Sequence, residues 1–93
     1  METFGGGGRV AELELVEDAV LDCRGLLCPM PVVRIGREIG AMFPGGVVKV
    51  LATDRGALAD VPAWAADTGN ELLAWHAASD HLVFYIRKGF GEG

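Results

Sequence analysis

The sequence predicts an α+β fold: a two-layer α/β sandwich with two helices on one face of a four-stranded mixed sheet, in the order β-α-β-α-β-β. Three patterns support this prediction. Apolar residues recur with helical periodicity over 31–43. A β-branched run spans 47–52, and apolar and polar residues alternate over 81–88, as is typical of strands. Helices thus connect the early strands, and a hairpin ends the chain.

The first strand is expected at 18–23, where a short apolar run follows two acidic residues. Upstream, 10–16 alternates only partly, and the pattern leaves open whether this segment forms a strand. Residues 1–9 contain four consecutive glycines, which lose much backbone entropy on ordering, and 89–93 look similarly loose. We therefore expect a single domain over 10–88 between two flexible tails.

The first helix is expected to begin at Pro31, because proline suits the first helical position, where its missing N–H costs nothing. Pro44 and the two glycines after it should stop the helix. A helical wheel gathers one apolar face that should pack on the sheet: Val32, Ile35, Gly36, Ile39, Met42 and Phe43.

The second helix is expected to end near Thr68. Asp60 is a candidate N-cap, Pro62 would then lie in the first turn, and Gly69 suits the left-handed position after the last turn. Asp60 is therefore interpreted as a structural residue that satisfies backbone donors at the start of this helix.

The last two strands are expected at 71–77 and 81–88, joined by a short turn. The sheet face opposite the helices should carry part of the set Leu51, Trp75 and Tyr85. Such a half-apolar face hints at self-association, but the sequence does not fix the oligomeric state.

Composition and charge exclude several classes of protein. With 51% hydrophobic and 23% charged residues, the chain of 93 residues should fold. No apolar run reaches the roughly 18–20 residues of a membrane span. The net charge is −5, and the close basic pairs are Arg34/Arg37 and Arg87/Lys88, so we expect no direct nucleic-acid binding. The few cysteines and the lack of a signal-peptide pattern favour the cytoplasm.

Cys28 is the main candidate for chemistry. It precedes Pro29 and Pro31 in a Cys-Pro-x-Pro motif at the entrance to the first helix. The positive end of the helix dipole and its unpaired amides should favour a thiolate, and the prolines should fix the direction of the sulfur. Such a thiolate is a nucleophile that can accept sulfur as a persulfide. The simpler alternative is a small buried hydrophobic residue.

The segment from Leu21 to Pro31 reads Leu-Asp-Cys-Arg-Gly-Leu-Leu-Cys-Pro-Met-Pro, and this segment resembles the signature of the TusA-like (SirA-like) sulfur-carrier family. The likeness covers about 19–88. It continues through further segments with matching order and spacing: Pro44-Gly45, Ala52-Thr53-Asp54, Asp60-Val61-Pro62-Ala63-Trp64 and Thr68-Gly69.

The resemblance implies a sulfur carrier or sulfurtransferase with the fold described above. Cys28 would be the persulfide-bearing residue, with Pro29, Pro31 and Gly25 as motif positions that orient it. The implied donors are a cysteine desulfurase or a rhodanese-like protein, and the implied acceptors are DsrE-like or other relay proteins. The family serves pathways such as tRNA thiolation and sulfur oxidation. It needs no metal or organic cofactor.

The accessory residues are less defined. Arg24 would add positive charge near the sulfur, although a solvated loop arginine is the simpler interpretation. Cys23 lies five residues before Cys28 and would suit either a resolving thiol or a strand-end residue that faces the core.

Three further alternatives remain open from the sequence. The first is a thiol redox switch formed by Cys23 and Cys28, and the second is a non-enzymatic regulatory module that keeps the same fold. The third is zinc binding by both cysteines with His76 and His81, although their spacing fits no familiar zinc motif and we expect no metal.

Overall fold

The structure, a computed structural model, describes residues 16–90. Its elements are β1 (Ala19–Cys23), α2 (Met30–Gly40), β2 (Val47–Ala52), α3 (Ala57–Thr68), β3 (Glu71–Ala77) and β4 (Leu82–Arg87). This order is the predicted one, and each predicted strand agrees with the observed bounds to within a residue. The predicted amino-terminal tail, most of the ambiguous 10–16 segment and the last three residues lie outside the described range.

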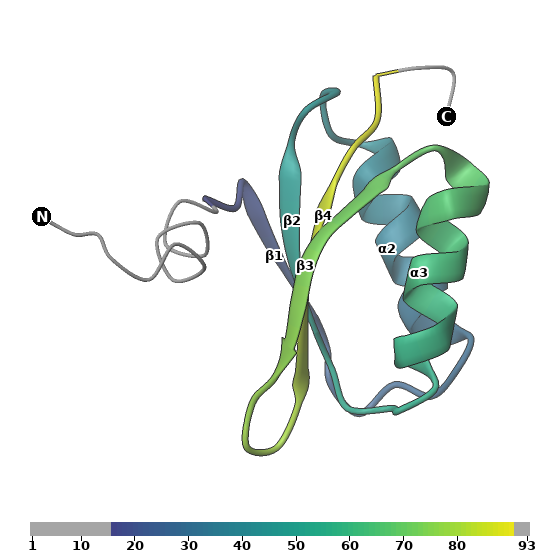
Figure 1. The fold of residues 1–93 in the computed structure, drawn as a ribbon, viewed down its shortest axis with the longest axis vertical. Coiled ribbons are helices and arrows are strands. Elements are labelled where there is room, and N and C mark those ends of the chain that lie inside the picture. Colours follow the sequence, from purple (N-terminus) through teal and green to yellow (C-terminus); the bar gives the residue numbers. More distant parts are fainter. Residues whose placement is uncertain (1–15, 91–93) are drawn as a thin grey trace, which may run out of the picture.

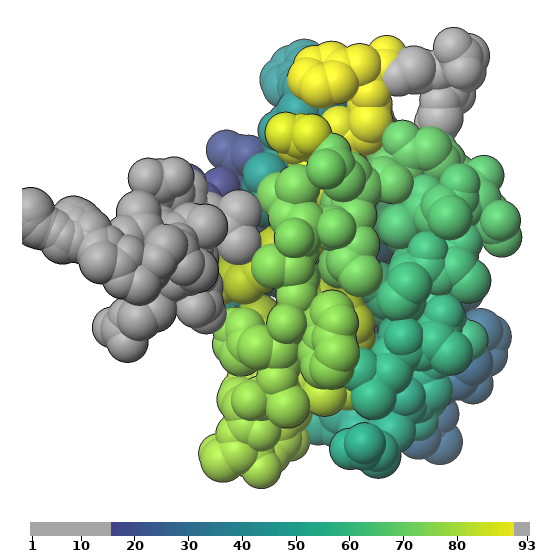
Figure 2. All heavy atoms as spheres, in the orientation of Figure 1, coloured from purple at the N-terminus to yellow at the C-terminus, as the bar shows by residue number. Residues whose placement is uncertain are grey.

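The sheet has the strand order β1-β2-β4-β3. β1 pairs with β2 in parallel, while β4 pairs antiparallel with both β2 and β3. Figure 1 shows both helices on one face of this sheet, which confirms the predicted two-layer α+β arrangement. On the face drawn in Figure 2, β3 and α3 lie side by side. Within the described residues, no helix is long and apolar enough to cross a membrane.

The core fills the space between the helices and the central strands. β2 buries every second residue, as expected for a strand with one packed face, whereas β4 is buried on both faces. The largest fully buried side chains are Phe84, Ile35, Ile86, Val48, Val50, Val61 and Cys23.

The outer face carries only part of the set expected for it, because Trp75 lies on the helix side of the sheet. A register shift between Leu72 and Ala74 adds one residue to β3 and reverses the alternation beyond it. Trp75 therefore pairs with Phe84 on the helix side, where the two rings stack with centroids 6.4 Å apart. Because β3 is an edge strand, Trp75 remains half exposed there.

The prediction that Phe43 belongs to the apolar face of the first helix is wrong, because α2 ends earlier. The helix ends at Gly40, and the N–H groups of Ala41 and Met42 close it with bonds to carbonyls three residues back. Met42 still packs against the core, but Phe43 is 87% exposed and does not contribute to the apolar face. The tight turn after Gly40 rotates Phe43 away from the position that continued helical periodicity gives it.

The start of α3 lies earlier than expected, so Asp60 is not its N-cap. The N-cap is Gly56 and the helix begins at Ala57, while the Asp60 N–H already donates to the Gly56 carbonyl at 2.9 Å. The side chain of Asp54 accepts the Gly56 N–H at 3.3 Å and turns the chain into the helix. Pro62 consequently lies inside α3 rather than in its first turn.

The close approach of Gly89 to the end of α3 leads to a first prediction. Gly69 ends α3 in the left-handed conformation, as predicted, with φ of 76°. A Cβ on Gly89 would lie only 2.0 Å from the Gly69 carbonyl oxygen, a backbone atom that cannot rotate away. Gly89→Ala is therefore expected to lower the free energy of unfolding by about 1–3 kcal/mol.

Urea denaturation measures this effect, and Gly40→Ala is the matched control. A Cβ on Gly40, in the last turn of α2, meets nothing within 4 Å. That variant should be unchanged or more stable by up to about 1 kcal/mol, since alanine favours a helix. Equal stabilities of the two variants would contradict the assigned contact.

Candidate functional site

Two loops meet at one edge of the sheet and build the candidate site. β1 and β2 are parallel neighbours, so the segments that follow them begin at the same edge, at the lower end of the molecule in Figure 1. The Gly25 N–H donates to Thr53 Oγ1 at 2.9 Å, and the Cys28 N–H donates to Asp54 Oδ2 at 2.7 Å. Side chains of the second loop thus hold the first loop, and with it Cys28, in place.

Cys28 is exposed and immediately precedes Pro29, the N-cap of α2, so the thiol is accessible at the predicted position. Few backbone N–H groups at the start of α2 could donate a hydrogen bond to the Cys28 sulfur. The Met30 N–H donates to the Leu27 carbonyl, Pro31 has no N–H, and a later amide of the first turn bonds the Pro29 carbonyl. Two amides of the first turn therefore bond backbone carbonyls rather than the sulfur.

A carboxylate lies against the sulfur instead. Cys28 Sγ donates to Asp60 Oδ2 at 2.5 Å, a contact between residues that are 32 positions apart in the sequence. Asp60 comes from the first turn of α3, and Asp54 from the loop before it.

Sequence reasoning assigned Asp60 to helix capping and missed this contact with the sulfur. The signal that could have revealed it is the parallel β1–β2 pair, which brings the two helix starts together.

The electrostatics around Cys28 reverse the prediction of a stabilised thiolate. The hydrogen bond to Asp60 is the main cause that raises the pKa of the Cys28 thiol above its ordinary value. Desolvation and the negative charges of Asp60 and Asp54 act in the same direction. This direction is opposite to the one expected from the start of α2 alone.

Arg24 does not contribute its charge to the sulfur. Its guanidinium forms two hydrogen bonds with Asp22, both at 2.9 Å, and the two side chains are about half exposed. This pairing lowers the pKa of the Asp22 carboxyl to about 2. The guanidinium is therefore engaged by a local partner.

Two of the motif residues have clear structural roles. Gly25 adopts φ of 85°, a conformation that favours glycine, and this turn lets its N–H reach the second loop. Pro31 is buried in the first turn of α2. Pro29 follows a cis peptide bond from Cys28.

Cys23 is a core residue at the end of β1. Its side chain is fully buried, and burial is the main cause that raises the pKa of its thiol. Both cysteines are free. Over residues 16–90, no three histidine, cysteine or acidic side chains gather into a group that could hold a metal ion. The structure therefore does not assemble the hypothetical zinc ligands.

Exposed apolar side chains lie close to Cys28 in the chain. Leu27 is 73% exposed, and Met30 and Val33 on the first turn of α2 are each 43% exposed. Leu27 and Met30 flank Cys28 closely in the chain, and Val33 lies about one helical turn beyond Met30. We call these three residues the apolar rim of the site.

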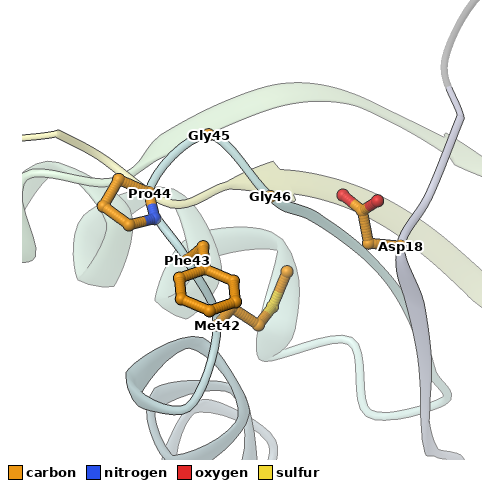
Figure 3. A pocket seen from close by; sticks show the side chains of 6 residues that line it. All are labelled: Asp18, Met42, Phe43, Pro44, Gly45 and Gly46. Carbon is orange, nitrogen blue, oxygen red and sulfur yellow. The ribbon is translucent and has the colours of Figure 1, made fainter.

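A separate pocket lies at the other end of α2 (Figure 3). It is lined by Asp18, Met42, Phe43, Pro44, Gly45 and Gly46. The Asp18 carboxylate accepts the Val47 N–H at 2.8 Å, so it ties β1 to β2. Because α2 separates this pocket from Cys28, it does not form part of the thiol site.

This geometry defines a class of protein: a small α+β domain that presents an exposed thiol at a helix start, with one carboxylate bound to the sulfur and another bound to the backbone N–H of the same cysteine. The family described as "Sulfurtransferase TusA" matches residues 19–88, and the chain belongs to this family.

Individual relatives agree with this assignment. The chain is 41% identical over 71 residues to the sulfur carrier protein TusA of Allochromatium vinosum, covering 76% of this chain and 93% of that protein. It is 43% identical over 70 residues to YrkF of Bacillus subtilis, named as a candidate sulfur carrier, covering 75% of this chain but only 38% of YrkF.

A solved structure confirms the fold. The SirA-like protein of Desulfitobacterium hafniense superposes with a TM-score of 0.62 at 25% identity, over 77% of this chain and 99% of that one. The predicted resemblance to the TusA-like (SirA-like) family is thereby confirmed.

Proposed function

We propose that the protein is a sulfur carrier in which Cys28 accepts sulfane sulfur as a persulfide and passes it to the thiol of an acceptor protein. The observation that carries this proposal is the exposed Cys28 thiol, which begins the Cys-Pro-x-Pro motif of a chain that belongs to a family described as a sulfurtransferase. An exposed sulfur can be approached by the sulfur of another protein, as direct transfer requires.

The transfer is a thiol exchange with balanced atoms. The Cys28 thiolate attacks the terminal sulfur of the donor's persulfide, and the new S–S bond forms as the donor's own S–S bond breaks. The donor leaves as a thiolate and takes up a proton. In the second half, an acceptor thiolate attacks the terminal sulfur on Cys28 in the same way. No net oxidation occurs, and the reaction needs neither a metal nor an organic cofactor.

The apolar rim supports docking of partner proteins around the thiol. Leu27, Met30 and Val33 present exposed hydrocarbon near Cys28 in the chain, and burial of such side chains by a partner favours association. We propose a cysteine desulfurase or a rhodanese-like protein as donor, and a DsrE-like or other relay protein as acceptor. A free thiol of this kind fits the reducing cytoplasm.

No observation favours the alternative functions over this one. A redox switch needs the two sulfurs to meet, whereas Cys23 is fully buried in the core and Cys28 is exposed. A regulatory module without chemistry would leave the exposed thiol unexplained.

The proposal is tested by loading the protein with sulfur. Incubation with a cysteine desulfurase and L-cysteine is expected to raise the intact mass by that of one sulfur atom, and a reducing thiol should reverse the gain. After alkylation and proteolysis, the extra sulfur should be found on the peptide that contains Cys28. A control without desulfurase should gain nothing. Sulfur found on Cys23 instead, or no gain with desulfurase and rhodanese donors alike, would contradict the proposal.

A further inference from the structure

The contact between Cys28 and Asp60 carries an inference that rests on the proposed function and concerns its regulation. We propose that Asp60 is a positioning residue that holds the resting Cys28 side chain as a neutral, hydrogen-bonded thiol, and that the reactive thiolate forms when a donor protein pairs a cationic side chain with Asp60. The sulfur would then be inert in the free protein and reactive in the complex.

The first support is geometric. Asp60 Oδ2 accepts the hydrogen bond from Cys28 Sγ, and the donor and acceptor come from the two different helix starts of the site. The contact therefore exists only in the folded protein, and it fixes the direction of the thiol as well as its charge.

The second support is that helix capping does not account for the Asp60 side chain. The N-cap of α3 is Gly56, and that helix start has no side-chain cap hydrogen bond. An acidic residue in a first turn does interact favourably with the helix dipole. That interaction explains a negative charge at this position but not its hydrogen bond to a cysteine on another loop.

The third support is the charge around the sulfur. The charged groups that face it are Asp60 on α3 and Asp54 on the preceding loop, and both raise the pKa of Cys28. The start of α2 acts in the opposite direction, but the Met30 and Val33 N–H groups bond backbone carbonyls and Pro31 has no N–H. Asp54 binds the backbone N–H groups of Cys28 and Gly56, so Asp60 is the carboxylate that contacts the sulfur itself.

These observations indicate the chemistry of the partner. A cation that pairs with Asp60 removes the acceptor of the thiol hydrogen bond and neutralises the nearest negative charge, and both changes lower the pKa of Cys28. The proton leaves to solvent as the thiolate forms. Asp60 is only partly buried, so a lysine or arginine of a docked protein can reach it. The net charge of −5 also favours association with a positively charged surface.

The test measures the pH profile of Cys28 alkylation by iodoacetamide in the free protein, with wild type compared with Asp60→Asn. The asparagine removes the negative charge but keeps the shape of the side chain. The midpoint of the variant is expected at lower pH. Its rate near neutral pH should rise about threefold for each pKa unit, because the tenfold gain in thiolate is partly offset by lower nucleophilicity. Asp67→Asn, an exposed site near the other end of α3, is the matched control and should leave the midpoint unchanged.

The second measurement is sulfur loading by a cysteine desulfurase at low and high salt. Wild type and Asp67→Asn should load more slowly at high salt, and Asp60→Asn should lose part of this salt dependence. An unchanged midpoint in Asp60→Asn, an equal shift in Asp67→Asn, or equal salt dependence in all three proteins would overturn the inference.

The proposed carrier function and the proposed role of Asp60 can be contradicted independently of each other. If wild type loads on Cys28 but Asp60→Asn keeps the wild-type midpoint, the carrier function stands and the role of Asp60 is wrong. If the midpoint shifts but wild type takes up no sulfur, the role of Asp60 in setting the thiol charge stands and the carrier function is wrong. Circular dichroism and thermal unfolding of each variant establish that the proteins compared are folded.

Discussion

Cys28→Ser is expected to abolish sulfur loading completely, because a serine hydroxyl cannot form a persulfide. The substitution should leave the fold intact, since Cys28 is exposed and contributes nothing to the core. Its backbone N–H can still donate to Asp54, so the loop keeps its anchor. Intact mass after incubation with a cysteine desulfurase and L-cysteine measures the effect.

Cys23→Ala is the matched control for this variant. It removes the other sulfur of the chain, which is fully buried and has no access to a donor protein. We expect this variant to load to the wild-type extent while it loses some stability from the small cavity left in the core. Equal loading of Cys28→Ser and wild type would place the reactive sulfur elsewhere and remove the basis of the proposed function.

Phe84→Ala is expected to cost about 3–5 kcal/mol of the free energy of unfolding, as is typical for the loss of a fully buried aromatic side chain. Phe84 lies in the central strand β4, is fully buried and stacks with Trp75. Small domains have a total stability of about 5–15 kcal/mol, so a loss of this size threatens folding itself. Urea denaturation of the purified protein, or the soluble yield if it unfolds, measures the effect.

Phe43→Ala provides the contrast, because the same side chain is removed from a position that is 87% exposed. Its expected effect lies within about 0.5 kcal/mol of zero. A large loss for Phe43→Ala would mean that α2 continues to Phe43 as the periodicity suggested. A small loss for Phe84→Ala would contradict the central place of that residue in the core.

The elements themselves were predictable because their signals are local. The strand 47–52 and the hairpin strands were correctly placed by β-branched runs and alternation. The helix ends were not predictable in this way. Helical periodicity shows which residues share a face, but it does not show at which residue a helix begins or ends. Phe43 continues the pattern after α2 has ended, and Asp60 with Pro62 imitates a helix start, although the N-cap of α3 is Gly56.

Trp75 shows a similar limit within a strand. Alternation counted from Leu72 places it with the outer face, but one added residue in β3 reverses the remaining positions. Nothing in the local sequence marks this bulge, because it depends on how β3 pairs with β4.

The position of the exposed thiol was predictable, but the charges around it were not. Cys28 and the prolines around it form a contiguous motif, so the thiol and its exposed position followed from local residues. The partner of the thiol is a long-range feature, because Asp60 reaches Cys28 only through the parallel pairing of β1 and β2. The expectation of a thiolate considered only the helix that follows Cys28 and omitted the charges that the second helix supplies.

The assembly of the site from two distant helix starts has a consequence for the newly made chain. Before β1 and β2 pair, Cys28 has no carboxylate against it, and its thiol titrates as an ordinary cysteine. The folded thiol has the higher pKa, so its contribution to stability is present below the pKa of the unfolded thiol and disappears as pH rises through the folded one. Alkaline solution should therefore favour the unfolded chain, and incomplete folding leaves the sulfur more open to unwanted oxidation than the finished protein does.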